Sequence, residues 1–157
     1  MHGYLLPGLE KSPNAISAVV RHIPGVRLGV HTDEGRFSPR EVVAHLADWE
    51  PIFLRRMQTA ETSPGATVEV YDEGDRALEQ NYGGSDVGEQ LRLFRSARDK
   101  TVAWLKQLPS ESWSRAIEHP ERGRMTIEDL ANMLVGHDVY HLEQLTSALE
   151  NDTVGTW

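Results

Sequence analysis

The chain has 157 residues, no cysteine and a formal net charge of -8, with 24 acidic against 16 basic residues. This composition excludes disulfides and thiolate chemistry by the protein itself, and the negative charge, which would repel a phosphate backbone, disfavours nucleic-acid partners. Because no apolar run approaches the roughly 18 residues that cross a bilayer, and the start lacks the basic segment of a signal peptide, we expect one cytoplasmic domain over residues 1–157 without a membrane partner.

The amino-terminal part of the chain predicts one helix and a short helical piece before it. The helix begins at Ser12-Pro13, since serine can cap a helix and proline fits its first position, and it ends before Pro24-Gly25. Its apolar face consists of Ile16, Val19, Val20 and Ile23. The short piece covers residues 4–10.

The clearest helix signals lie in residues 37–60. Ser38 can cap the helix, Pro39 occupies its first position and Glu41 completes a capping box. Pro51 interrupts the pattern, but the apolar spacing continues beyond it, so we expect a kink rather than an end. The apolar stripe consists of Val42, Leu46, Trp49, Phe53 and Met57.

Two further helices follow, over residues 85–108 and from the capping box of Thr126 and Asp129 to Ala148. The connection between the second and third helices is long, and we expect a short helix within it over residues 75–82. Residues 67–71 alternate as a strand would, but no partner strand is evident, so an extended loop is expected there. The sequence therefore predicts an all-α four-helix bundle with short extra helices in the connections.

Histidines occupy the apolar stripes of two predicted helices. His137 and His141 are four residues apart, so both imidazoles project from one helical face and can chelate a metal ion. Taken alone, this pair is equally consistent with one core histidine and one partly exposed histidine. His45 lies beside the apolar stripe of another helix, and a divalent ion shared by all three would explain their burial.

Two metal-binding motifs that the sequence lacks make other types of metal site less favoured. The residue after His137 is not the glutamate of zinc proteases, and the Glu-x-x-His pairs of two-iron bundles are missing, so one ion is expected. Zinc, nickel, manganese, iron and cobalt all accept imidazole, and the sequence does not distinguish among them.

Two segments resemble the signatures of DinB-like (DinB/YfiT) metalloproteins. They are residues 37–50, FSPREVVAHLADWE, and residues 136–145, GHDVYHLEQL, and the likeness extends over residues 12–149. The resemblance implies a four-helix bundle of the up-and-down type, a metal site with the ligands His45, His137 and His141, and a homodimer.

Four other polar residues are candidates for contacts around the metal or the substrate. Gln144 shares a helical face with His137 and His141 and could orient a histidine, a metal-bound water or a substrate, although a solvated surface position is the more common role of such a residue. Asp48 and Asp138 could accept the second imidazole N–H, or could be exposed acids. His119 is expected to face solvent or substrate rather than to be a fourth ligand.

Three neutral ligands leave the charge of a divalent ion uncompensated, which favours an anionic hydroxide, thiolate or carboxylate at the open position. Some DinB-like proteins are transferases or isomerases that use a low-molecular-weight thiol, and others are assigned as hydrolases or have no known activity. We expect a metal-dependent transferase that activates such a thiol for a small-molecule substrate. The alternatives are a non-catalytic metal-binding stress-response bundle and a hydrolase that uses a metal-bound water, while the charge disfavours DNA repair.

Overall fold

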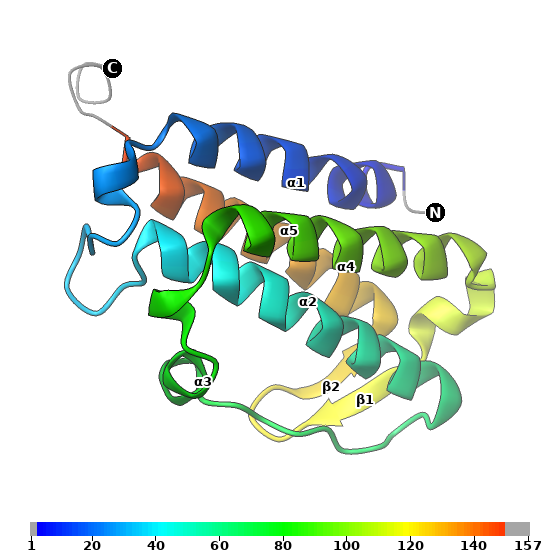
Figure 1. Ribbon diagram of the computed structural model, residues 1–157. Coiled ribbons are helices and arrows are strands. Elements are labelled where there is room, and N and C mark those ends of the chain that lie inside the picture. The colour runs from blue at the N-terminus through cyan, green and yellow to red at the C-terminus, as the bar shows by residue number, and fades with distance from the viewer. Residues whose placement is uncertain (1–2, 150–157) are drawn as a thin grey trace.

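Four long helices dominate the computed structural model, which describes residues 3–149 (Figure 1). They are α1 (Leu5–His22), α2 (Pro39–Thr62), α4 (Val87–Gln107) and α5 (Ile127–Thr146), and a shorter helix, α3 (Glu73–Glu79), lies between α2 and α4. Strands β1 (Ala116–His119) and β2 (Gly123–Thr126) form an antiparallel hairpin. The predicted four-helix bundle is confirmed, and the ends of the predicted domain over 1–157 lie outside the described residues.

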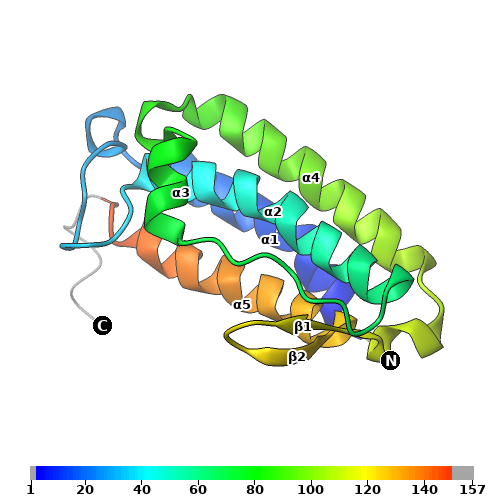
Figure 2. The same ribbon diagram turned by 90° about the horizontal axis from the view of Figure 1, so that it is seen from below.

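The order of the helices around the bundle differs from the order in the sequence. α2 packs against α4 and α5, and α1 packs against the same two helices, so the successive pairs α1–α2 and α4–α5 lie across the diagonals. In Figures 1 and 2, α2 and α4 run in one direction while α1 and α5 run in the other. The up-and-down arrangement that the family resemblance implied is therefore wrong for the step from α2 to α4, which are parallel.

A long connection makes the parallel step possible. α2 has 24 residues and is about 36 Å long at the helical rise, so the chain needs about ten extended residues to return along it. Residues 63–72 supply them, and α3 follows as the short helix expected within this connection. Thr67 makes an isolated parallel bridge with Glu118 of β1, which links the returning segment to the hairpin.

The hairpin is a feature that the sequence did not reveal. Residues 109–125 read as a loop, whereas Ala116 pairs with Thr126 and His119 with Gly123 in a regular antiparallel ladder. Each strand has only four residues, too few to show an alternating pattern. Gly123 has a φ of 72°, a left-handed conformation that glycine adopts without a steric penalty, and this permits the return after the turn.

The predicted start of the first helix is also wrong. α1 runs without a break through Pro13, although proline cannot donate to the carbonyl four residues earlier. That carbonyl belongs to Leu9, and it accepts a hydrogen bond of 3.0 Å from Nη1 of Arg98 instead. The helix therefore tolerates Pro13 because a side chain on another helix satisfies the acceptor that proline leaves free.

A buried polar layer crosses the middle of the bundle. Arg98 on α4 is 0% exposed and binds Glu50 on α2 at 2.8 and 2.9 Å and Asp138 on α5 at 2.7 and 3.0 Å. Its Nη1 also donates to Ser12 on α1 at 2.9 Å. Burial alone would lower the pKa of Arg98, but the two carboxylates outweigh it and raise that pKa. The layer separates the apolar core into two clusters, one toward the hairpin and one toward the opposite end.

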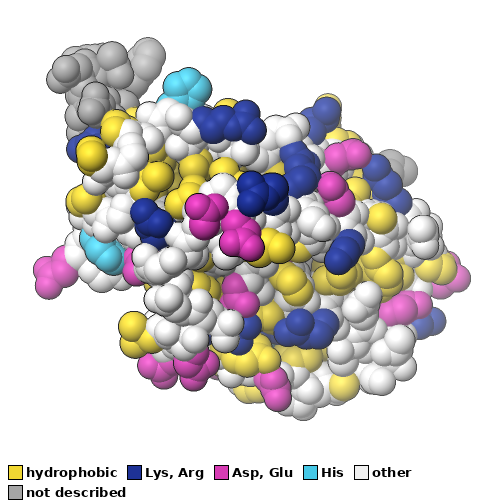
Figure 3. Space-filling model, viewed as in Figure 1, with side chains coloured by type: hydrophobic (Ala, Val, Ile, Leu, Met, Phe, Trp, Pro, Cys, Tyr) yellow, Lys and Arg dark blue, Asp and Glu magenta, His cyan; other side chains and the backbone are white. Residues whose placement is uncertain are grey.

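None of the helices within residues 3–149 is long and apolar enough to cross a bilayer. On the face shown in Figure 3, lysine and arginine side chains are interspersed with acidic and apolar ones. This face therefore has no continuous basic stripe of the kind that follows a phosphate backbone.

Replacing Arg98 by methionine should lower the free energy of unfolding by about 3 to 5 kcal/mol, because Glu50 and Asp138 would be left buried without their counter-charge. Chemical denaturation of the wild type and the variant measures this difference. The matched variant Arg92→Met, at an exposed position of the same helix, should change stability by no more than about 0.5 kcal/mol. Equal stabilities of the two variants would contradict this account of the polar layer.

Candidate metal centre

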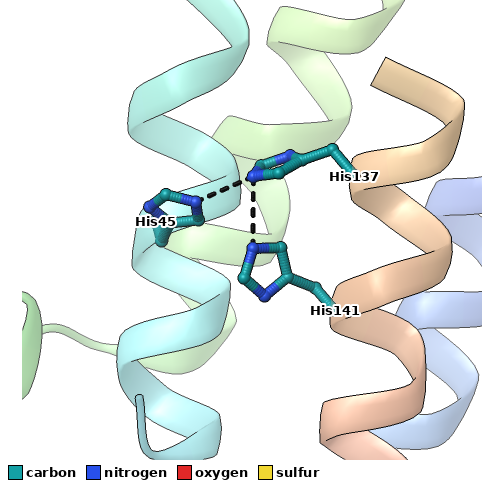
Figure 4. Close-up of side chains that lie close together, drawn as sticks. All are labelled: His45, His137 and His141. Carbon is teal, nitrogen blue, oxygen red and sulfur yellow. Dashed lines mark hydrogen bonds between the residues drawn. The ribbon is translucent and has the colours of Figure 1, made fainter. Parts of the chain in front are cut away.

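Three histidine side chains converge between α2 and α5 (Figure 4). His45 comes from α2, and His137 and His141 lie one turn apart on α5. The Nε2 atom of His137 is 2.8 Å from that of His45 and 3.1 Å from that of His141. One ring nitrogen of each histidine lies within 4.8 Å of the other two. The structure thus brings together the three side chains that the sequence singled out.

Capping boxes fix where the two histidine-bearing helices begin. The hydroxyl of Ser38 accepts from the backbone N–H of Glu41, whose carboxylate accepts from the N–H of Ser38. Thr126 and Asp129 form the same reciprocal pair at the start of α5. A defined start sets the rotation of each helix, and hence the face on which its histidines lie.

Burial keeps the three rings uncharged. Burial is the main cause that lowers the pKa of His45 to about 2, with smaller effects of His137 and His141. It is also the main cause that lowers the pKa of His137 to about 3, with smaller effects of His141 and Arg98. Burial also lowers the pKa of His141. Since each value lies below the ordinary one, the rings are neutral at pH 7, and neutral imidazole is the form that binds a metal ion.

Gln144 fixes the tautomer of His141. The Nε2 of Gln144 donates to the backbone carbonyl of Phe37 at 2.9 Å, so its Oε1 faces His141. An amide oxygen only accepts, and it lies 3.0 Å from Nδ1 of His141, which therefore carries the proton. The lone pair of His141 is consequently on Nε2, the atom that faces the other two histidines.

The donor set fits a divalent transition metal. At zinc–nitrogen distances of about 2.0 to 2.1 Å, two imidazole nitrogens in tetrahedral geometry lie about 3.3 Å apart. Two of the three pairs are close to this value, at 2.8 and 3.1 Å, and the third pair lies within 4.8 Å. His45 directs Nε2 toward this centre although its buried Nδ1 has no hydrogen-bond partner within the described residues. Three converging neutral nitrogens and no thiolate suit the metals that accept imidazole.

A cavity of about 1140 Å³ opens beside the histidines. His137 and His141 form part of its wall, whereas His45 does not line it. Its other walls come from α2, from the segment that leads into α3, and from the hairpin, which lies against α5 in Figure 2. The cavity gives a small molecule access to the side of the centre that the protein does not cover.

The two acids near the ligands do not contact the imidazoles in the described structure. Asp48 forms an ion pair with Arg76 and accepts a hydrogen bond of 2.7 Å from the hydroxyl of Tyr82. Asp138 belongs to the polar layer, where it binds Arg98. The predicted hydrogen bonds of Asp48 and Asp138 to imidazole N–H groups are therefore wrong, because both acids bind arginines instead. Those arginines lie on other helices, so the spacing along one helix could not reveal them.

His119 lies on β1 and lines the same cavity as His137 and His141. It is not one of the three clustered histidines, and its Nδ1 accepts from the backbone N–H of Glu121 at 3.3 Å. This position agrees with a substrate-facing residue rather than a fourth ligand.

Arg56 is a cavity residue that the sequence analysis missed. It is buried and lines the cavity beside Trp49 and Phe53. The three residues follow one another at four and three positions, so Arg56 falls on the apolar stripe of α2. A charged residue on such a stripe was the signal that could have identified it.

Comparison with known proteins places these features in a family. The family model of the DinB superfamily matches residues 9–145. A relative from Oceanobacillus iheyensis is 24% identical over 139 residues, which are 88% of this chain and 80% of the relative. YfiT from Bacillus subtilis is also 24% identical over 139 residues, 88% of this chain and 78% of YfiT. Both relatives bear the name "putative metal-dependent hydrolase".

Two kinds of solved structure share the fold. YfiT from Bacillus subtilis, described as a probable metal-dependent hydrolase with an unusual four-helix bundle topology, superposes with a TM-score of 0.87 at 22% identity, covering 93% of this chain and 84% of YfiT. A mycothiol-dependent maleylpyruvate isomerase superposes with a TM-score of 0.75 at 13% identity, covering 92% of this chain and 60% of the isomerase. At these identities the likeness establishes the fold alone.

Replacing Gln144 by alanine should lower the affinity for a divalent metal about 10- to 100-fold, because His141 would lose the acceptor that fixes its tautomer. Competition with a chromophoric chelator measures this change. Gln107→Ala, at the exposed end of α4, is the matched control and should bind metal as the wild type does. An unchanged affinity in Gln144→Ala would show that this hydrogen bond does not support the metal centre.

Proposed function

The chain belongs to the DinB superfamily, and on that basis we propose that it is an enzyme that uses one divalent ion, held by His45, His137 and His141, to activate a low-molecular-weight thiol. The observation that carries the proposal is the convergence of three imidazole nitrogens, from the buried His45 and His141 and the half-buried His137, beside a large cavity. Protein ligands on one side and an accessible position on the other are typical of catalytic rather than closed structural metal sites.

A bound divalent ion would supply a Lewis acid that lowers the pKa of a coordinating thiol or water toward neutrality. The chain's own residues prepare the position for an anion. The three histidines are neutral, so they leave the charge of the centre uncompensated, and Gln144 holds the ring of His141 in place. Trp49 and Phe53, both buried, form an apolar wall that limits the access of water.

Two features favour a thiol over water as the nucleophile. Water is a poor acid that profits from a neighbouring base, but Asp48 and Asp138, the two acids expected from the sequence to contact the imidazoles, are held by arginines. A thiol, with an ordinary pKa of about 8.5, loses its proton without such a base. The chain has no cysteine, so the thiol would come from outside, as in the mycothiol-dependent isomerase that shares the fold.

Hydrolysis is the second candidate, because relatives that align with 88% of the chain bear hydrolase names. The same ligands and cavity would serve a water nucleophile. The base would then come from the acids that line the cavity, such as Glu73, whose carboxyl pKa is raised mainly by partial desolvation.

The test is transfer of a thiol to a model electrophile. Metal-loaded protein is incubated with mycothiol, bacillithiol or cysteine and with 1-chloro-2,4-dinitrobenzene, and thioether formation is followed by absorbance. We expect His137→Ala and treatment with a chelator each to lower the rate roughly a hundredfold or more, because both remove the group that activates the thiol. His22→Ala, which changes an exposed histidine at the end of α1, should retain the full rate.

A rate that is unchanged in His137→Ala would contradict the proposed function. Thiol-independent ester hydrolysis that disappears in the same variant would instead support the hydrolase. If neither reaction occurs and chelation sharply lowers the melting temperature, the ion is structural and the chain is a non-catalytic metal-binding bundle.

A further inference from the structure

The cavity beside the histidines has a second polar wall. Arg56 from α2, His119 from β1 and Arg122 from the hairpin turn all line it together with His137 and His141. The chain as a whole has a net charge of -8, so a gathering of basic side chains at one wall is not a consequence of composition.

Arg56 is held in place by neutral contacts. Its guanidinium lies over the ring of Trp49, 5.8 Å from the centroid, and its Nη2 donates to the backbone carbonyl of Glu69 at 2.8 Å. The carboxylate of Glu69 accepts from Tyr71 instead. None of the ion pairs among residues 3–149 includes Arg56.

A comparison with Arg98 shows that Arg56 lacks a carboxylate partner. Both arginines are buried, with 7% of Arg56 and 0% of Arg98 exposed. Arg98 has two carboxylates, whereas Arg56 has one backbone carbonyl and an aromatic face. A buried charge is unfavourable unless a counter-charge accompanies it. The position of Arg56 at a cavity wall allows that counter-charge to come from a ligand.

The positive charge of Arg122 adds to that of Arg56 at this wall. Burial is the main cause that lowers the pKa of Arg56, and the charges of Arg122 and Arg55 lower it further, while Tyr71 opposes them. Burial also lowers the pKa of His119, followed by the charges of Arg56 and Arg122, against a smaller effect of Glu121. Arg56 and Arg122 thus both lie close to His119, and an anion bound there would be attracted by both.

None of the acids that line the cavity forms an ion pair with Arg56 within residues 3–149. Asp72 and Asp129 cap α3 and α5 through backbone N–H groups. Burial raises the pKa of Glu73, although the charge of Arg122 opposes that shift. Neither Glu73 nor Glu121 forms an ion pair with an arginine within the described residues.

We infer that Arg56, assisted by Arg122 and His119, binds a carboxylate group of the substrate in the cavity that His137 and His141 also line. A planar guanidinium with free N–H groups matches a carboxylate, which can accept two parallel hydrogen bonds. The inference rests on the proposed function for the existence of a small-molecule substrate. It adds the substrate class, a compound with a carboxylate at one end and its reacting group near the histidines.

The test compares two probes of nearly the same shape by calorimetric titration, the anion 3-phenylpropanoate and the neutral 3-phenylpropanamide. The protein is used as purified and again after chelation, so that binding of the carboxylate to a metal ion is separated from binding to Arg56. We expect the carboxylate to bind at least about tenfold more tightly than the amide in both forms, and Arg56→Met to abolish this preference.

The control is Arg55→Met, which changes the neighbouring arginine that lines a separate cavity between α2 and α4 and should leave the preference intact. Arg122→Met, at an exposed position, should reduce the preference without disturbing the fold, which keeps the test informative if Arg56→Met does not fold. Equal binding of the two probes by the wild type, or equal losses in Arg55→Met and Arg56→Met, would overturn the inference.

A second arm identifies which reactant carries the carboxylate. Thiol transfer is compared for 3-mercaptopropanoate and 3-mercaptopropanamide, and then for 4-chloro-3-nitrobenzoate and the corresponding benzamide as electrophiles. An Arg56-dependent preference with one pair assigns the carboxylate to that reactant. Carboxylate binding without transfer would refute the proposed function and leave the anion site standing, whereas transfer without any such preference would refute the anion site alone.

Discussion

Arg98 is the buried charge around which the four long helices are arranged. It binds Glu50 on α2, Asp138 on α5 and the Leu9 carbonyl on α1 from its own position on α4. A buried ion cluster adds little net stability compared with apolar packing, but it is satisfied in only one arrangement of its partners. Asp138 lies between the two histidines of α5 in the sequence, so the contact of this helix with Arg98, which also binds Glu50 of α2, helps to set His137 opposite His45.

The connectivity of the bundle supplies the cavity. Because α2 and α4 are parallel, the chain returns along the bundle through residues 63–72, and this segment joins the hairpin at the bridge between Thr67 and Glu118. The returning segment, the hairpin and the histidine-bearing faces of α2 and α5 enclose the space in which a substrate would lie. A simple up-and-down bundle has short connections that would leave this side of the metal centre uncovered.

The sequence predicted the parts of this structure that depend on local signals. Ser38 and Thr126 marked the starts of α2 and α5, and the helical period placed the three histidines on buried faces. The sequence did not predict the features in which a residue depends on a partner that is distant in the sequence. Pro13 reads as a helix start unless Arg98 satisfies the carbonyl of Leu9, and neither the diagonal order of the helices nor the hairpin has a local pattern that specifies it.

The central claim is that His45, His137 and His141 together hold one divalent ion, and elemental analysis of the purified protein tests it most directly. We expect about one equivalent of a transition metal per chain in the wild type and in the control His31→Ala, which changes an exposed histidine. We expect almost none in His45→Ala, which leaves only the pair on α5. Retention of a full equivalent by His45→Ala, or failure of the wild type to take up any of the imidazole-binding metals when they are supplied, would contradict the account.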